Sequence, residues 1–150
     1  MSDRVITEFK GVYSALSNFS PHEVFYDGYW YPTAEHAFQA AKTFDDEKRW
    51  FIGLAASPQE AKRMGRRVEL RDRWDELRTP IMLSILLWKF TGHFKTRQTL
   101  LATGTADLIE GNYWHDNYWG DCYCDKCSDI SGVNQLGKSL MCVRSIIGQT

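Results

Sequence analysis

The sequence predicts an α+β fold, a mostly helical single domain over residues 1–150 with a small N-terminal antiparallel sheet. Two local signals carry this prediction: a hairpin pattern near the N-terminus and a series of capped helical stretches after it. The chain has 150 residues, 43% of them hydrophobic, so it can bury one core without disulfide or metal staples. Its 18 Lys and Arg against 19 Asp and Glu argue against a protein that coats nucleic acid or an anionic membrane by bulk attraction.

The hairpin is predicted by two β-prone runs separated by two turn residues. Val24–Tyr26 and Tyr29–Tyr31 flank Asp27 and Gly28, a pair that is typical of tight hairpin turns. The residues before this hairpin are predicted to be extended.

A helix is predicted directly after the hairpin. Pro32 ends the second strand, and Thr33 is a suitable N-cap for a helix that continues to Lys42. The capping box is incomplete, because His36 stands where a glutamate or glutamine is needed.

Further helices follow from cap residues and apolar spacing. The predicted helices cover residues 45–54, 57–65, 79–90 and 95–102. The third of these is apolar on nearly every face and is expected to be the central buried helix. Apolar residues at helical spacing predict a last helix around Leu136, Leu140, Val143 and Ile147.

A long loop precedes the last helix. Leu108 and Ile109 predict a short strand, and residues 111–132 then form a polar, aromatic stretch of 22 residues. A loop of this length inside a compact domain is usually functional.

The helix after Pro32 carries a candidate catalytic face. Glu35, Gln39 and Lys42 are spaced by four and seven positions, so they project from one side. For an arbitrary helix, such charges form a solvated surface. The functional interpretation is a carboxylate for proton transfer and an amine that holds or attacks a carbon atom.

Residues 61–73 form a basic stretch with six Lys and Arg residues and only two acidic residues, Glu69 and Asp72. It is either ordinary surface or a site that grips phosphate oxygens, for which Arg is well suited.

The long loop also contains candidate metal ligands. Cys122, Cys124 and Cys127 form a C-x-C-x-x-C cluster, and His115, Cys142 or an aspartate would supply a fourth ligand for zinc. There is no second C-x-x-C, and reduced free thiols are the alternative interpretation.

Nothing in the sequence indicates export or membrane insertion. The first ten residues lack the apolar region of a secretory signal, and the longest apolar stretch, residues 81–90, is too short to span a bilayer. We therefore expect a cytoplasmic protein. P-loop and dinucleotide-binding glycine motifs are also missing from the sequence.

Taken together and in this order, several segments resemble the NADAR family, also called YbiA-like. The segments are 16–19 (LSNF), 31–42 (YPTAEHAFQAAK), 61–66, 89–90, 100–103, 116–120 (DNYWG) and 132–137 (GVNQLG) running into Arg144. The resemblance covers about residues 13–144. It implies a YbiA-like fold and an N-glycosidase that acts on ADP-ribosylated guanine, or on phosphoribosylamino-pyrimidine intermediates of riboflavin synthesis. This sequence departs from the family pattern between Gly120 and Asn134. The stretch carries cysteines here, whereas in some family members it is short and Gly-rich.

The residues suit this chemistry, because breaking a C–N bond at an anomeric carbon builds positive charge there and needs a proton on the leaving base. We expect Glu35 to transfer the proton or stabilise the cation, Lys42 to attack C1 and form a Schiff base, and Asp116 to activate water or hold ribose hydroxyls. The expected substrate-binding residues are Asn18, Phe19, Trp30, Tyr31, His36, Gln39, Gly65, Arg66, Trp119, Gly120 and Asn134.

The leading expectation is a metal-independent glycohydrolase whose partner is an ADP-ribose-containing substrate, on DNA or RNA guanine or on a nucleotide. Structural zinc at the cysteines is compatible with it. The alternatives are the riboflavin-intermediate N-glycosidase, a non-catalytic ADP-ribose or nucleotide reader, and a zinc-stabilised nucleic-acid module.

Overall fold

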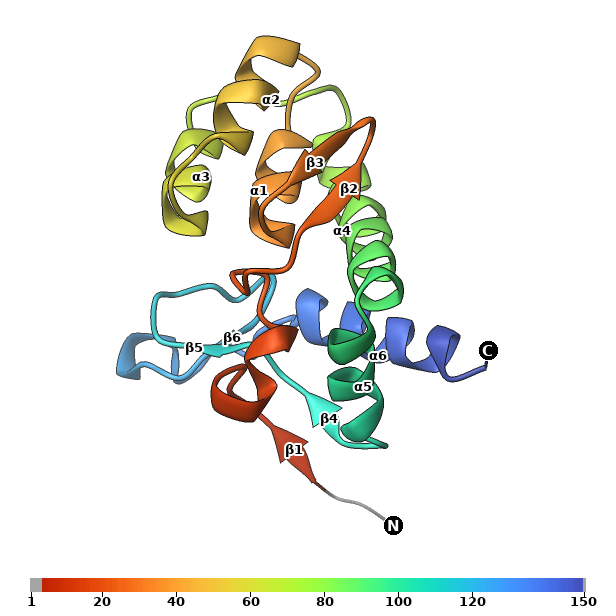
Figure 1. Ribbon diagram of the computed structural model, residues 1–150. Helices are drawn as coiled ribbons and strands as arrows, with labels where there is room; N and C mark the ends of the chain where they lie inside the picture. The colour runs from red at the N-terminus through yellow and green to blue at the C-terminus, as the bar shows by residue number, and fades with distance from the viewer. Residues whose placement is uncertain (1–3, 150) are drawn as a thin grey trace. The chain divides into compact units, whose positions relative to one another are not determined.

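A computed structural model describes residues 4–149, and predictions that touch residues 1–3 and 150 lie outside the described residues. The chain divides into two compact units (Figure 1). The central unit is Asn18–His93, and the terminal unit combines the residues up to Ser17 with those from Phe94 onward. Both contain helices and short strands, which confirms the predicted α+β, mostly helical class. A single domain over residues 1–150 stays a prediction.

The predicted hairpin opens the central unit. β2 (Val24–Tyr26) and β3 (Tyr29–Tyr31) pair antiparallel, the first residue of β2 opposite the last of β3. Asp27 and Gly28 have φ angles of 47° and 91°. Two positive φ angles in succession are the signature of a tight turn that matches the twist of the strands, and Asp-Gly supplies them at low cost.

Helix α1 (Ala34–Ala40) lies at the centre of this unit, against the hairpin and the other central helices. Thr33 is its N-cap as predicted, and the Thr33 hydroxyl accepts a hydrogen bond from the backbone N–H of His36 at 3.1 Å. Every residue of α1 is buried, so its polar side chains are held inside the protein.

The next two helices begin and end close to their predicted positions. α2 (Asp46–Gly53) is capped by the side chain of Asp45, and α3 (Pro58–Gly65) by that of Ser57. Each cap satisfies a backbone N–H that the first helical turn leaves without a partner.

The long helix α4 (Trp74–Gly92) differs from the prediction, because it begins before Thr79 and contains Pro80. A proline lacks one backbone N–H and usually begins a helix. Here two acidic residues in the first turn favour an earlier start, and the ring of Trp74 packs against Phe38 with a centroid distance of 5.3 Å. The expectation of a central buried helix is confirmed by its buried residues, which include Met82, Ile85, Leu86 and Phe90.

The terminal unit contains two parallel strand pairs that the sequence did not indicate. β1 (Val5–Ile6) pairs with β4 (Asp107–Leu108), and β5 (Gly111–Asn112) pairs with β6 (Asp121–Cys122). The prediction of a strand near Leu108 is confirmed. The prediction of residues 111–132 as irregular loop is wrong in part, since β5, β6 and a 3₁₀ turn, η2 (Asp125–Cys127), lie within them.

The extended segment expected before the hairpin is also wrong in part. A 3₁₀ helix, η1 (Gly11–Leu16), follows β1 and packs against α5 (Phe94–Ala102). Gly11 has a φ of 60°, which permits the sharp entry, and burial of Leu16 holds the segment in place. The last helix, α6 (Gln135–Ile147), buries the four apolar positions that predicted it.

Candidate functional site

One carboxylate and one amide side chain of α1, those of Glu35 and Gln39, form the centre of the candidate site. Gln39 donates a hydrogen bond from Nε2 to Oε1 of Glu35 at 2.9 Å. Glu35 is 7% exposed and Gln39 is 3% exposed. The backbone N–H of Glu35 in turn donates to the carbonyl oxygen of Asn18 at 3.0 Å, so Asn18 adjoins this pair.

The same region holds two buried acceptor atoms without donors. Oε1 of Gln39 and Oδ1 of Asn18 find no hydrogen-bond partner among the described residues. Leaving a buried acceptor unsatisfied costs about 1–3 kcal/mol. A ligand that brings hydroxyl or N–H donors, such as a ribose, would satisfy them.

Lys42 shares the electrostatic environment of this pair. Its side chain is half-buried, and desolvation lowers the pKa of its amine from the ordinary value of 10.5. The charge of Glu35 raises that pKa, whereas Arg66 and Lys62 lower it further. A lowered pKa increases the fraction of neutral amine, which is the nucleophilic form.

Helix α3 approaches α1 at Gly65. A Cβ atom at Gly65 would overlap the side-chain amide oxygen of Gln39, so a larger residue here would require the Gln39 amide to shift. Arg66 follows directly as the exposed C-cap residue of α3. The structure therefore brings together six of the predicted site residues: Asn18, Glu35, Gln39, Lys42, Gly65 and Arg66.

His36 is placed differently from the other α1 residues. It is 1% exposed, Nδ1 lies 2.8 Å from the Thr33 hydroxyl, and Nε2 lies 3.0 Å from the carbonyl oxygen of Ala55. Both ring nitrogens are thus engaged within the fold, and desolvation lowers the pKa of the imidazole. A substrate contact by His36 stays a prediction, as does one by the half-buried Phe19.

Trp30 and Tyr31 point to opposite faces of β3, as successive strand residues do. Trp30 is 60% exposed and meets the ring of Trp88 edge-on, with a centroid distance of 5.2 Å. Tyr31 is 2% exposed, and burial raises the pKa of its phenol to about 12. Stacking of either ring on a substrate stays a prediction.

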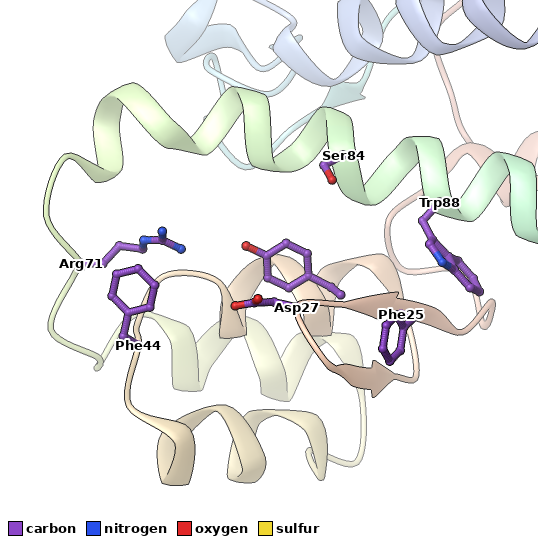
Figure 2. A pocket seen from close by; sticks show the side chains of 7 residues that line it. Phe25, Asp27, Phe44, Arg71, Ser84 and Trp88 are labelled. Atoms are coloured by element: carbon purple, nitrogen blue, oxygen red, sulfur yellow. The ribbon is translucent and has the colours of Figure 1, made fainter.

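A pocket of about 390 Å³ opens in the central unit between the hairpin and α4 (Figure 2). This volume is within the range of small-molecule sites. Figure 2 shows Phe44 and Arg71 at one end and Phe25 and Trp88 at the other, with Asp27 between them. None of the predicted substrate-binding residues lines it.

Two charged contacts shape this pocket, and sequence reasoning missed both. The guanidinium of Arg71 stacks on Phe44, 3.8 Å from the ring centroid, and donates to the carbonyl oxygen of Ala41 at 3.3 Å. Arg49 is 4% exposed and forms an ion pair with Asp27 at 2.6 Å. Arg71 was noticed only as part of a basic stretch, because its stacking partner is distant in sequence.

A second lysine with a lowered pKa also escaped sequence reasoning. Lys89 is completely buried in α4 and donates from Nζ to the hydroxyl of Ser20 at 2.7 Å. Burial lowers the pKa of Lys89 to about 7. The sequence marks it as an amine within the apolar stretch 81–90 and as part of the segment 89–90 that resembles the NADAR family.

In the terminal unit, Asp116 organises a tight turn. Its Oδ1 accepts hydrogen bonds from the backbone N–H groups of Tyr118 and Trp119, at 3.2 Å and 2.9 Å. Asn112 donates from Nδ2 to the backbone carbonyl of Asp116 at 2.8 Å. The structure thus brings Asp116 and the half-buried Trp119 into one turn.

Gly120 and Asn134 hold the base of this loop. A Cβ atom at Gly120 would overlap the carbonyl oxygen of Glu110. Asn134 has a φ of 58°, accepts from the backbone N–H of Glu110 at 3.0 Å and donates to the carbonyl of Leu108 at 2.9 Å. Because its amide is engaged at both ends in the fold, a substrate contact by Asn134 stays a prediction.

The cysteines gather beside the Asp116 turn. The ligand atoms of His115, Cys122, Cys124 and Cys127 all lie within 4.8 Å of one another and form a group able to hold a metal ion. Of the fourth ligands considered from sequence, His115 is the one in this group. Cys142 lies exposed on α6, outside it.

No helix in the stretch 4–149 combines the length and apolar character needed to cross a membrane.

Comparison with known proteins decides the family. The model of the NADAR domain matches residues 7–148. This chain belongs to the NADAR domain family. This NADAR chain is similar to the solved NMR structure of the E. coli protein YbiA, with 36% sequence identity and a TM-score of 0.83. The match covers 99% of this chain and 88% of the YbiA chain. The resemblance and the YbiA-like fold expected from sequence are confirmed.

The relatives of this NADAR protein carry enzyme names. It is 40% identical over 144 residues to an N-glycosidase of Nostoc punctiforme, covering 90% of this chain and 86% of that protein. It is 40% identical over 138 residues to N-glycosidase YbiA of Escherichia coli K12, covering 88% and 80%. It is 31% identical over 157 residues to the chloroplastic riboflavin biosynthesis protein PYRR of Zea mays, covering 91% of this chain and 24% of that protein. These names support a hydrolase that acts on N-glycosyl bonds.

Proposed function

We propose that this NADAR protein hydrolyses the N-glycosidic bond of ADP-ribosylated guanine, in nucleic acid or in a nucleotide. The observation that carries the proposal is the pairing of a buried carboxylate on α1 with a half-buried amine that lies two residues beyond the end of that helix. The charge of Glu35 raises the pKa of Lys42 against the larger effect of desolvation, and this interaction supports a shared role of the two groups at one ribose. Such a pair offers a proton donor and a nucleophile to the same anomeric carbon.

The first step breaks the bond to the base. The neutral Nζ of Lys42 attacks C1 of the ribose, and the C1–N bond breaks with its electron pair moving to the base nitrogen. Glu35 delivers a proton to that nitrogen, so guanine leaves neutral. The C1–O bond of the ring then breaks, one of the two amine protons passes to the ring oxygen and the other returns to Glu35, and the C1–Nζ bond becomes an imine, the Schiff base.

The second step restores the lysine. Water, activated by Glu35, adds to the C1 carbon of the imine, both water protons pass to Nζ, and the C1–Nζ bond breaks. The amine leaves with a proton, and C1 becomes the aldehyde of ADP-ribose, which closes to the ring form. These steps use side chains and water, so we expect no cofactor to take part in catalysis.

Charge and hydrogen-bonding capacity beside the pair suit the rest of the substrate. Arg66 is exposed next to Lys42 and suits a phosphate oxygen, which Arg binds through two parallel hydrogen bonds. The acceptor atoms of Gln39 and Asn18 that lack donors suit ribose hydroxyls.

A second substrate class has a specific observation in its favour. The maize relative is named as a riboflavin biosynthesis protein, and this chain matches about a quarter of its length. A phosphoribosylamino-pyrimidine also joins a ribose phosphate to nitrogen. The same carboxylate, amine and arginine would therefore serve the same bond cleavage on a smaller substrate.

A product assay distinguishes the candidates. Purified protein is offered ADP-ribosyl-guanosine and a phosphoribosylamino-pyrimidine at equal concentration, and the released sugar is measured by liquid chromatography and mass spectrometry. At least ten-fold faster release of ADP-ribose supports the proposal. Faster cleavage of the phosphoribosylamino-pyrimidine would indicate that the natural substrate is a riboflavin intermediate. Binding of ADP-ribose with no turnover of either compound would contradict the proposed enzymatic activity and indicate a non-catalytic ADP-ribose-binding protein.

A further inference from the structure

The cysteines of the terminal unit have no part in the proposed bond cleavage, yet they converge on one point. We propose that His115, Cys122, Cys124 and Cys127 bind one zinc ion, and that this ion closes the cysteine loop, residues 113–133. The metal site stands on the geometry of these four side chains and does not depend on the proposed substrate.

The distances match a single tetrahedral ion. Nδ1 of His115 lies 3.3 Å from Sγ of Cys124, 3.4 Å from Sγ of Cys127 and 4.0 Å from Sγ of Cys122. Zinc bound at about 2.3 Å to sulfur and about 2.0–2.1 Å to nitrogen, with tetrahedral angles, places nitrogen about 3.6 Å from each sulfur. The observed distances lie on both sides of this value.

The ligand types select zinc and a structural role. Three thiolates with one imidazole form a complete tetrahedral set, which is typical of structural zinc sites and leaves no position open for substrate. All four ligand atoms lie within 4.8 Å of one another, which suits one ion. An iron–sulfur cluster, whose cysteines bind different iron atoms, would hold the sulfurs further apart.

A second set of contacts supports the ligands. The backbone N–H of His115 donates to Sγ of Cys122 at 3.3 Å, and Nδ2 of Asn117 donates to Sγ of Cys127 at 3.4 Å. Oδ1 of Asn117 accepts from the backbone N–H of Cys122 at 2.9 Å. N–H donors stabilise negative charge on thiolate sulfur, and such outer contacts orient the ligands of metal sites.

The site joins distant parts of the loop. His115 lies between β5 and β6, and Cys122 ends β6. Cys124 precedes the η2 turn, and Cys127 ends it. His115 also has a φ of 71°, a conformation uncommon for a residue other than glycine. One ion would hold this conformation and connect it to the other three ligands. Because Asp116 follows directly, the ion would also fix the Asp116 turn.

The experiment measures metal content in the full-length protein. Protein expressed in zinc-supplemented medium and passed through a desalting column is analysed by elemental mass spectrometry, and we expect about one zinc per chain. Cys127→Ser and His115→Ala should each lower the zinc content at least five-fold after the same treatment. Cys142→Ser is the matched control and should retain the ion. Cobalt substituted for zinc should give the absorption bands of tetrahedral thiolate coordination.

Thiol labelling of the unaltered protein keeps the test decisive if a variant fails to fold. With zinc bound, only Cys142 should react rapidly with an alkylating reagent, and all four thiols should react after chelation. Less than about 0.2 zinc per chain in folded protein, rapid labelling of all four thiols before chelation, or a disulfide within the cluster would overturn the proposal. Equal loss of zinc in Cys142→Ser would overturn the ligand set.

Discussion

Gly65 lies against the side-chain amide of Gln39 where α3 meets α1, and no atom beyond hydrogen fits between them. Gln39 in turn holds Glu35 through a 2.9 Å hydrogen bond. The position of the candidate proton donor is therefore connected to the packing of two helices. A change at Gly65 acts on Glu35 without touching it.

The first prediction concerns this contact. Gly65→Ala should destabilise the protein by about 1–3 kcal/mol, because overpacking forces the neighbouring side chain or backbone to shift. Urea unfolding measures the effect. Gly53→Ala is the control, since the added Cβ would meet only the ring of Tyr31 at an ordinary 3.5 Å. Equal stability of Gly65→Ala and Gly53→Ala would show that the Gln39 side chain moves away from the added Cβ at no cost in free energy.

The second prediction concerns Lys42. Borohydride added during turnover should reduce the Schiff base and leave a mass adduct on Lys42, because a reduced C–N bond no longer hydrolyses. Lys42→Ala and Lys42→Arg should give no adduct, since a guanidinium keeps its charge. Lys89 serves as an internal control, because it also has a lowered pKa but is completely buried. Full activity of Lys42→Ala would replace the covalent route with direct attack by water.

The third prediction concerns Glu35. Glu35→Gln should keep the hydrogen bond to Gln39 in reach and still bind ADP-ribose, yet lose about 10²–10⁴-fold in kcat, the usual contribution of positioned proton transfer. Single-turnover kinetics with a calorimetric measurement of product binding separates the two effects. A rate within three-fold of the unaltered protein would remove Glu35 from the mechanism.

The fourth prediction concerns the phosphate contact. Arg66→Ala should weaken ADP-ribose binding by about 1.5–3 kcal/mol, the range for a hydrogen bond to a charged group, and leave the unfolding midpoint unchanged. Arg63→Ala is the matched control, because Arg63 lies one turn earlier on α3 and already pairs with Glu60. Equal affinities of both variants by calorimetry would place the phosphate elsewhere.

The fifth prediction concerns stability against pH. Burial lowers the pKa of Lys89 from 10.5 to about 7, so between these values the unfolded chain binds more protons than the folded protein. The free energy of unfolding should therefore rise with pH in this window, by about 2 kcal/mol from pH 7 to 9. Below pH 7 the cost of the buried charge is fully present.

Lys89→Met provides the comparison for this slope. It lacks the titrating amine, so its unfolding free energy should rise less over the same pH range, while every other group contributes equally to both proteins. Chemical denaturation at pH 7, 8 and 9 measures the difference. Parallel pH profiles would show that Lys89 keeps an ordinary pKa.

Local signals explain which helices were predictable from the sequence. The N-caps Asp45 and Ser57 act within one turn, so their helices begin where the sequence indicates. The prediction of a helix start at Thr79 is wrong, because packing of Trp74 on Phe38, which is distant in sequence, adds to the acidic first turn and favours an earlier start. The parallel pairs of β1 with β4 and of β5 with β6 depend on long-range hydrogen bonds that periodicity does not report.

The candidate site follows the same division. Helical spacing predicted that Glu35 and Gln39 share one face, because that relation is internal to α1. The prediction that the helix continues to Lys42 is wrong, since α1 ends at Ala40 and Lys42 lies in the turn that follows. The stacking of Arg71 on Phe44 depends on contact between two segments that are distant in sequence. Neither segment carries a sequence pattern that predicts this contact. The cysteine spacing indicated a metal site, but three possible fourth ligands remained until the backbone turn at His115 brought its ring to the sulfurs.

The terminal unit is assembled from two separate stretches of chain, and this has a consequence for synthesis on the ribosome. Among the described residues β1 pairs with β4 alone. Because β4 is translated roughly 100 residues later, at about 5–20 residues per second, β1 waits some 5–20 s for its partner. The central unit is continuous and is complete before β4 leaves the ribosome. It is therefore positioned to fold first during translation, and the helix that carries Glu35 acquires its neighbours before the loop that carries Asp116 exists.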